Sequence, residues 1–541
     1  MKKQSKDSML VQGSILAAAG LITKLLGFLY RIPMANMLGE QGNGIYSVAF
    51  SIYNIALTLS SYSLPAAVSK LISERLGRGE RNGARQMFRI ALAFAAAGGL
   101  CAFAVLFFGA RGLEALYHRE GLARPLQVLA PTALVVALLG VLRGWFQGRG
   151  NMLPTAISQI LEQLVNVAVS LLAAWQFLRI FRARPDAASF GAAGGAVGTL
   201  AGAAAALLFL WLLYRLGRGG ARPLPRMEQQ RKSAACRALV LTVVPMMLSQ
   251  TIYQLGSTVD DLLFGRAMER QGMADVMAAS LQGVYNTQYN QLTTLPVAIT
   301  TAMAATLLPG IALLWSQGKR KEALRKTRTV IKLNMAVAIP AAAGLAVLAE
   351  PIMTLLFPSL TAYRGLSVRM LQTGSAAVIF YALSTITAAV LQGSDHMNLP
   401  AVHAAAALAV HTVLVWVLLH RTSLGIYALI VGNVTFPLML AALNCHAIRK
   451  RLRCRWELRR TFLLPAALST VMGLLAWGSY QGLRRLGVEM SWSLLLSIAA
   501  SMLFYGLALL RMGCFSRSEL SELPLGGLLE RIAGMPGEPE A

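Results

Sequence analysis

Residues 90–110 read IALAFAAAGGLCAFAVLFFGA and contain no charged side chain. A run of about 20 apolar residues is long enough to cross the hydrocarbon core of a bilayer as a helix. A strand of a membrane barrel would instead alternate apolar and polar residues, which this stretch does not do. The stretch therefore predicts a transmembrane helix.

Thirteen other stretches of the chain share this character. The fourteen predicted spans cover residues 9–30, 44–69, 90–110, 126–146, 153–178, 190–214, 238–264, 281–314, 330–357, 367–391, 400–419, 425–447, 461–482 and 491–511. Of the 541 residues, 56% are hydrophobic and 13% are charged, against roughly 25% charged in a soluble domain. This composition excludes a soluble multidomain protein and a disordered chain. We expect an all-α integral membrane protein.

The net charge of +27 follows the predicted topology. Of the 50 Lys and Arg residues, 35 lie on one side of the predicted spans and 14 on the other, and Lys24 lies inside the first span. The basic side should be cytoplasmic. The sequence therefore predicts a multi-pass protein of the bacterial cytoplasmic membrane with both termini in the cytoplasm. Basic residues placed between long apolar runs do not indicate a nucleic-acid partner.

The chain contains an internal repeat with an offset of 239 residues. Gly44-Ile45-Tyr46 matches Gly283-Val284-Tyr285, and residues 79–81 match 318–320. Six spans separate the two copies, so both halves have the same orientation, as in transporters built from parallel repeats. We predict an N-lobe over residues 1–222, a C-lobe over 223–450, an appended helix pair over 451–515 and a cytoplasmic tail over 516–541.

Four motifs resemble those of the stage V sporulation protein B group. They are GNGIY at 42–46, LPAAVSK at 64–70, FQGRGNM at 146–152 and LPVAITTA at 295–302. The group belongs to the multidrug/oligosaccharidyl-lipid/polysaccharide (MOP) exporter superfamily and includes the MurJ-type lipid II flippases. The resemblance implies a MATE-like, two-lobed fold of fourteen helices. It also implies a flippase that moves undecaprenyl-pyrophosphate-linked sugars outward by alternating access.

The first span carries the best candidate for substrate binding. A charge at the depth of Lys24 costs roughly 2.5–3.5 kcal/mol on insertion scales, and such charges usually serve function. Lys24, Phe28 and Arg31 share a helix face, so the two cations could bind a pyrophosphate. The alternative is that Arg31 extends to the outer interface and Lys24 pairs with a buried carboxylate.

Polar side chains inside other spans are further candidates. Glu162, Gln163 and Asn166 form part of a polar stripe, and Glu162 is a candidate partner for Lys24, a proton carrier or a structural acid. Asn286 and Asn290 lie in an amide-rich stretch that predicts a water-lined cavity, where amides would bind sugar hydroxyls or satisfy neighbouring helices.

A second polar face is predicted on the span over residues 238–264. Gln250, Gln254 and Asp261 share this face, and Asp260 adjoins it near the outer end. The amides are candidate substrate ligands. The two carboxylates are candidates for coupling to Na⁺ or to protons, with a water-facing acid pair as the alternative. The membrane potential is a further candidate driving force, and the sequence indicates no resident cofactor and no metal site.

The leading hypothesis is a flippase for a lipid-linked oligosaccharide, most specifically lipid II. The alternatives are a flippase for another lipid-linked polysaccharide unit, a multidrug or cation exporter of the same superfamily, and a membrane scaffold for wall synthesis. A cation exporter should have an acidic and aromatic site, which Lys24 disfavours. No P-loop or nucleophile motif indicates an enzyme. We expect a monomer whose partners are its substrate, membrane lipids and cell-wall synthesis proteins.

Overall fold

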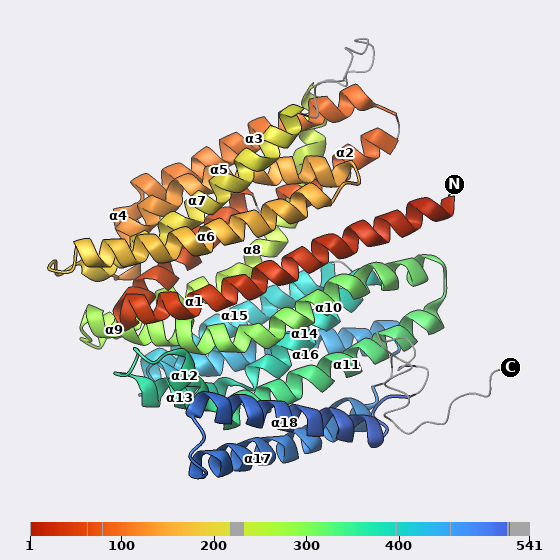
Figure 1. Cartoon of the computed structure of the whole chain (residues 1–541). Coiled ribbons are helices and arrows are strands. Elements are labelled where there is room, and N and C mark those ends of the chain that lie inside the picture. Colours follow the sequence, from red (N-terminus) through yellow and green to blue (C-terminus); the bar gives the residue numbers. More distant parts are fainter. Residues whose placement is uncertain are drawn as a thin grey trace. The chain divides into compact units, whose positions relative to one another are not determined.

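The computed structural model describes residues 2–61, 63–77, 79–216, 232–394, 396, 398–454, 456–516 and 519, with only the backbone for several residues within 2–21, 232–257 and 302–316. The described residues form helices and no strands (Figure 1). Each of the fourteen predicted ranges overlaps a helix, which confirms the fold class. Ten described helices are long and apolar enough to span a membrane, and α13 with α14, bent by 46°, would make eleven.

The described helices follow one another in chain order. In the first part of the chain they are α1 (Lys2–Ser60), α2 (Leu64–Gly77), α3 (Arg81–Phe108), α4 (Ala110–Tyr117), α5 (Ala123–Gly148), α6 (Leu153–Ile180), α7 (Ala187–Leu216), α8 (Lys232–Arg270) and α9 (Asp275–Gly283). A π-helical segment, η2 (Val284–Tyr289), leads to α10 (Asn290–Ser316). Then come α11 (Arg320–Val347), α12 (Ala349–Leu356), α13 (Arg364–Gly374), α14 (Ala377–Gly393), α15 (Asn398–Arg421), α16 (Tyr427–Leu452), η3 (Arg459–Leu463), α17 (Leu464–Arg485) and α18 (Met490–Arg511).

The boundary between the first two predicted spans is wrong. Residues 31–43, expected to form a loop, belong to α1, which consists of two helices joined by a kink at Gly39 (φ 68°, ψ −179°). Only glycine adopts this conformation readily. The buried side chain of Asn43 donates hydrogen bonds to the carbonyl oxygens of Ala35 (2.7 Å) and Gly39 (2.6 Å). Asn43 therefore ties the helix that follows the kink to backbone carbonyls before and at the kink.

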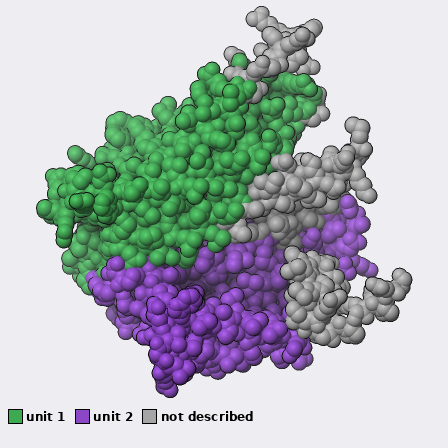
Figure 2. Space-filling model, viewed as in Figure 1, with its two compact units in different colours: residues 1–287 green, residues 288–541 purple. Residues whose placement is uncertain are grey.

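The packing divides the chain into two compact units, residues 1–287 and 288–541 (Figure 2). Helices α8 and α9 pack within the first unit, although the repeat assigns them to the second lobe. The predicted lobe boundary near residue 222 is based on the sequence repeat and not on packing. It therefore stays a prediction.

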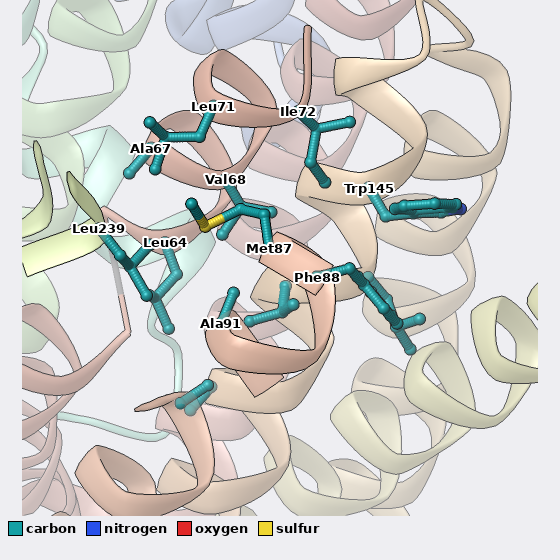
Figure 3. Close-up of a cluster of buried hydrophobic side chains, with 14 of the residues drawn as sticks. Leu64, Ala67, Val68, Leu71, Ile72, Met87, Phe88, Ala91, Trp145 and Leu239 are labelled. Carbon is teal, nitrogen blue, oxygen red and sulfur yellow. The ribbon is translucent and has the colours of Figure 1, made fainter. Parts of the chain in front are cut away.

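In the first unit, small residues let helices approach closely. On α5, Gly140, Gly144 and Gly148 lie one turn apart and face α2, where a side chain at Gly144 would meet Val68 Cβ at 2.7 Å and Pro65 O at 2.9 Å. Membrane helices commonly pack through such small-residue rows. Beside this contact, side chains of α2, α3, α5 and α8 form an apolar cluster (Figure 3).

In the second unit, α10, α11, α14 and α16 enclose a separate apolar core. The appended pair α17–α18 packs against α11, and the Tyr505 hydroxyl donates to the Ala336 carbonyl at 3.0 Å. Lys332, only 1% exposed, forms ion pairs of 2.9 Å with both Glu457 and Glu519. Burial alone would raise the pKa of Glu519, but hydrogen bonds from the Ser516 amide and Lys332 lower it below its usual range. Lys332 therefore ties the chain beyond α18 to α11.

Candidate functional site

Lys24 is an exposed residue on the helix of α1 that precedes Gly39, and Arg31 is exposed seven residues later. Lys24 has no hydrogen bond or ion pair with any residue that the structure describes. A side chain at Gly27, one turn beyond Lys24, would lie 3.4 Å from Gln163 Nε2 of α6. The structure therefore brings the Lys24 region of α1 beside the predicted polar stripe at Gln163.

The suggested pairing of Lys24 with Glu162 is wrong. The Glu162 carboxylate instead accepts a hydrogen bond from Arg143 Nη2 of α5 at 2.6 Å, and Arg143 Nε donates to the Ser158 hydroxyl at 3.1 Å. Both charged side chains are largely buried, Arg143 at 14% and Glu162 at 29% exposure. Glu162 already has a cation of its own, which leaves Lys24 available to an external anion.

Sequence reasoning missed Arg143 because the residue was counted with the loop that follows the span over 126–146. Its position inside that predicted span was the available signal. Asn166 lies on the α7 side of α6: its Oδ1 accepts from the Ser170 hydroxyl at 2.9 Å, and that hydroxyl also contacts the Gly195 carbonyl at 2.8 Å. Gln163 and Asn166 therefore make different contacts, Gln163 beside α1 and Asn166 beside α7.

A second polar site joins α1, α8, α9 and the connection between α4 and α5. Asp261, 1% exposed, accepts hydrogen bonds on Oδ1 from Gln282 Nε2 (2.5 Å) and Asn286 Nδ2 (3.0 Å). Arg119 Nη2 donates to Gln282 Oε1 at 2.5 Å, and Asn286 also donates to the Ser47 hydroxyl at 3.3 Å. The predicted residues Asp261 and Asn286 thus lie in one network, which we call the Arg119–Asp261 network.

This network adjoins a polar pocket of about 1050 Å³. The pocket is lined by Gln127 of α5 and by residues from three connections that the charge pattern places on the outer side, over 110–126, 178–190 and 264–281. Within it, Arg119 pairs with Asp275 (3.2 Å) and His118 with Glu269 (2.8 Å). Burial lowers the pKa of the Arg119 guanidinium, while Asp275 and Asp261 act in the opposite direction. The guanidinium stays charged, as arginine does in proteins.

The remaining predicted residues fall outside this network. Asp260 is buried beside it. The side chains of Gln250 and Gln254 lie outside the described residues. Asn290 belongs to the second unit, where its Oδ1 accepts from Asn433 Nδ2 at 3.4 Å, while the Tyr289 hydroxyl donates to Asn433 Oδ1 at 3.0 Å. Asn286 lies within the π-helix η2, whereas Asn290 is the first residue of α10.

Comparison with known proteins identifies the family. A family described as polysaccharide biosynthesis protein matches residues 10–315, which is more than half of the chain. The chain belongs to the polysaccharide biosynthesis protein family. Stage V sporulation protein B of Bacillus subtilis (strain 168) is 26% identical over 97% of this chain and 99% of its own length. Lipid II flippase MurJ of the same strain is 24% identical over 72% of this chain and 73% of its own.

This chain shares the fold of a solved structure of lipid II flippase MurJ in an inward closed conformation. It aligns with a TM-score of 0.67 over 91% of this chain and 97% of that chain, at 12% identity. The described residues give this chain two features suited to transport. Among these residues, the Lys24 cation has no ion-pair partner and lies inside one span, and a buried polar network lies at the predicted outer end.

Proposed function

We propose that this protein is a flippase that carries lipid II, an undecaprenyl-pyrophosphate-linked glycan, across the bacterial cytoplasmic membrane by alternating access. Its membership of the family, and the lipid II flippase among its relatives, support a transporter and not an enzyme. The observation that carries the proposal is the exposed residue Lys24 within a membrane span, with no ion-pair partner among the described residues. Such a charge is stable only where water or an anion reaches it.

The chemistry of the first unit suits an anionic head group. A pyrophosphate offers several anionic oxygens, and Lys24 supplies a cation that no carboxylate of the described residues neutralises. Gln163 beside it is a hydrogen-bond donor and acceptor suited to sugar hydroxyls. A cationic drug would be repelled by Lys24, which disfavours the multidrug exporter.

Coupling to Na⁺, protons or the membrane potential remains part of the proposal. In the structure two amide N–H groups point at Oδ1 of the buried Asp261 carboxylate, which is the candidate to bind the coupling cation or proton. The proposal further includes cytoplasmic termini, a monomer, and contacts with membrane lipids and cell-wall synthesis proteins.

The test is rescue of a bacterial strain depleted of its lipid II flippase, with lipid II accessibility measured at the outer leaflet. We expect the wild-type protein and Lys24→Arg to restore accessibility, and Lys24→Gln to lose it at equal membrane abundance. Lys70→Gln, which removes an exposed lysine in the middle of α2, is the matched control and should behave as wild type.

Two results would count against the proposal. Wild-type protein that reaches the membrane but restores no lipid II accessibility would exclude lipid II, and rescue of a strain lacking another lipid-linked glycan flippase would then assign that substrate. Full rescue by Lys24→Gln would exclude Lys24 as the anion-binding residue.

A further inference from the structure

The polar pocket of about 1050 Å³ lies wholly within the first unit and has the composition of a site for a hydrophilic ligand. Most of its lining residues are charged or carry an amide or imidazole, and Met273 is the one large apolar side chain among them. Pockets for apolar ligands are lined mainly by hydrophobic and aromatic side chains instead. The composition therefore excludes a lipid chain or an apolar drug as the occupant.

Most charges of the pocket wall are already neutralised within the wall. The ion pairs join Arg119 to Asp275 (3.2 Å), Arg124 to Asp186 (2.5 Å) and His118 to Glu269 (2.8 Å). The Glu114 carboxylate accepts hydrogen bonds from the backbone amides of Gly121 (3.2 Å) and Ala123 (2.7 Å). These groups shape the pocket and have little capacity left for a ligand.

Two charged side chains of the lining remain available. Arg111, in the first turn of α4, and Glu120, in the connection between α4 and α5, are both exposed residues. Neither side chain forms a hydrogen bond or an ion pair with any residue that the structure describes. The pocket thus offers one cation and one anion, which complement a ligand that carries a carboxylate and an amine.

The connection that carries Glu120 is held in one conformation. His118 has a left-handed backbone (φ 47°), which costs a residue other than glycine about 1–2 kcal/mol, and Gly121 has a φ of 82°. The Glu120 amide donates to Asp275 Oδ2 at 2.8 Å, and the Ser189 hydroxyl donates to the Gly121 carbonyl at 2.6 Å. A binding group on such a fixed connection loses little conformational entropy when a ligand arrives.

We infer that the polar pocket is a second binding site of this protein, for a short peptide with a free amine and a free carboxylate. Glu120 binds the amine and Arg111 binds the carboxylate. The volume lies at the upper end of the range for ligand pockets, so it suits a peptide of several residues better than a single amino acid. The site is separate from Lys24, and the inference does not depend on the proposed transport.

The test measures equilibrium binding of a labelled peptide to the purified full chain in mixed micelles. The probe is N-acetylated Ala-Ala-Lys-Ala-Ala, whose charges are one lysine amine and one terminal carboxylate. Two matched peptides each lack one charge, through a terminal amide or an acetylated lysine. We expect each matched peptide to bind about fivefold more weakly, the upper limit for an exposed ion pair.

Variants of the protein assign each charge of the peptide to its partner. Arg111→Gln should bind the free carboxylate and the terminal amide equally, and Glu120→Gln should bind the free and the acetylated lysine equally. Arg182→Gln removes an exposed arginine of the connection over 178–190 that does not line the pocket. This control should keep both preferences of the wild-type protein.

Each outcome supports or overturns the site. No binding of the probe, or equal binding of all three peptides by the wild-type protein, would overturn it, and this comparison stands even if a variant fails to fold. Preferences that persist in both Arg111→Gln and Glu120→Gln would place the binding elsewhere and overturn the pocket. With the expected preferences, competition by lipid II would identify the peptide of a lipid-linked head group as the source. Absence of competition would identify a free peptide.

Failure of the proposed function gives a different result. A protein that shows the expected peptide preferences but restores no lipid II accessibility would refute the flippase and leave the pocket supported.

Discussion

The ion pair between Arg143 and Glu162 gives a quantitative prediction about the first unit. Removing one partner of a fully buried pair costs about 3–5 kcal/mol, because it leaves an uncompensated charge. Exposed pairs contribute about 0.2–1 kcal/mol. The exposures of 14% and 29% place this pair between the two cases. We expect Arg143→Gln and Glu162→Gln each to destabilise the protein by about 2 kcal/mol.

The double variant should lose less free energy of unfolding than the two single variants lose in sum. In the double variant both charges are absent, and the two new amides can still hydrogen-bond. We expect a coupling energy of about 1–2 kcal/mol between the two sites. The assay is equilibrium unfolding of the purified protein in mixed micelles, as a double-mutant cycle. Arg149→Gln, at an exposed arginine just beyond α5, is the control and should cost less than about 0.5 kcal/mol.

A second cycle between Lys24 and Glu162 makes the test decisive. Since the structure gives Glu162 to Arg143, Lys24→Gln and Glu162→Gln should add within about 0.5 kcal/mol. Stronger coupling of Glu162 to Lys24 than to Arg143 would refute the reasoning and restore the pairing considered from the sequence.

Three further predictions concern local features. Asn43→Ala should lower the free energy of unfolding by about 1–3 kcal/mol, because two carbonyls at the kink lose their donor; an unchanged unfolding midpoint would contradict this role. Gly144→Val should cost at least about 1–3 kcal/mol through overpacking against α2, while Gly344→Ala should cost nothing measurable in the same unfolding assay. Burial raises the pKa of the Cys514 thiol to about 11, so maleimide at pH 8 should label Cys514 far more slowly than the exposed Cys236. The labelling rate of Cys514 should rise as the pH increases, and equal labelling rates for the two cysteines would contradict the burial of Cys514.

The helices could be predicted because apolar runs of membrane length mark them directly. The break between the first two helices could not be placed from the sequence, because Arg31, Pro33 and Glu40 are residue types that are common in loops. The feature that decides the break is the backbone conformation of Gly39. A single glycine with positive φ has no sequence pattern of its own. Helix continuity across residues 31–38 therefore depends on packing and not on composition.

Only part of the candidate site could be predicted, because the contacts between helices are not visible in the sequence. Asp261 and Asn286 were found because polar residues in apolar spans are conspicuous, and the structure joins them. Arg119 and Arg143 were assigned to connections, where arginine is common, and only tertiary contacts show that both are largely buried. The partner of a charged side chain on another helix cannot be identified from spacing along one helix.

The contact between α1 and α9 bears on how this chain arose. A side chain at Gly44 would overlap the Ala279 carbonyl oxygen, and one at Gly283 would overlap the Glu40 carbonyl oxygen, so the two contacts are equivalent under the repeat offset of 239. If the two halves descend from one duplicated gene, the ancestor was half as long and formed a parallel homodimer with a two-fold axis along the membrane normal. In that dimer one glycine made both contacts now made by Gly44 and Gly283, so any substitution altered both sides at once. Fusion of the two copies released this constraint. The flanking residues then diverged, so that Glu40 and Ala279 now differ while the carbonyl groups they contribute do not.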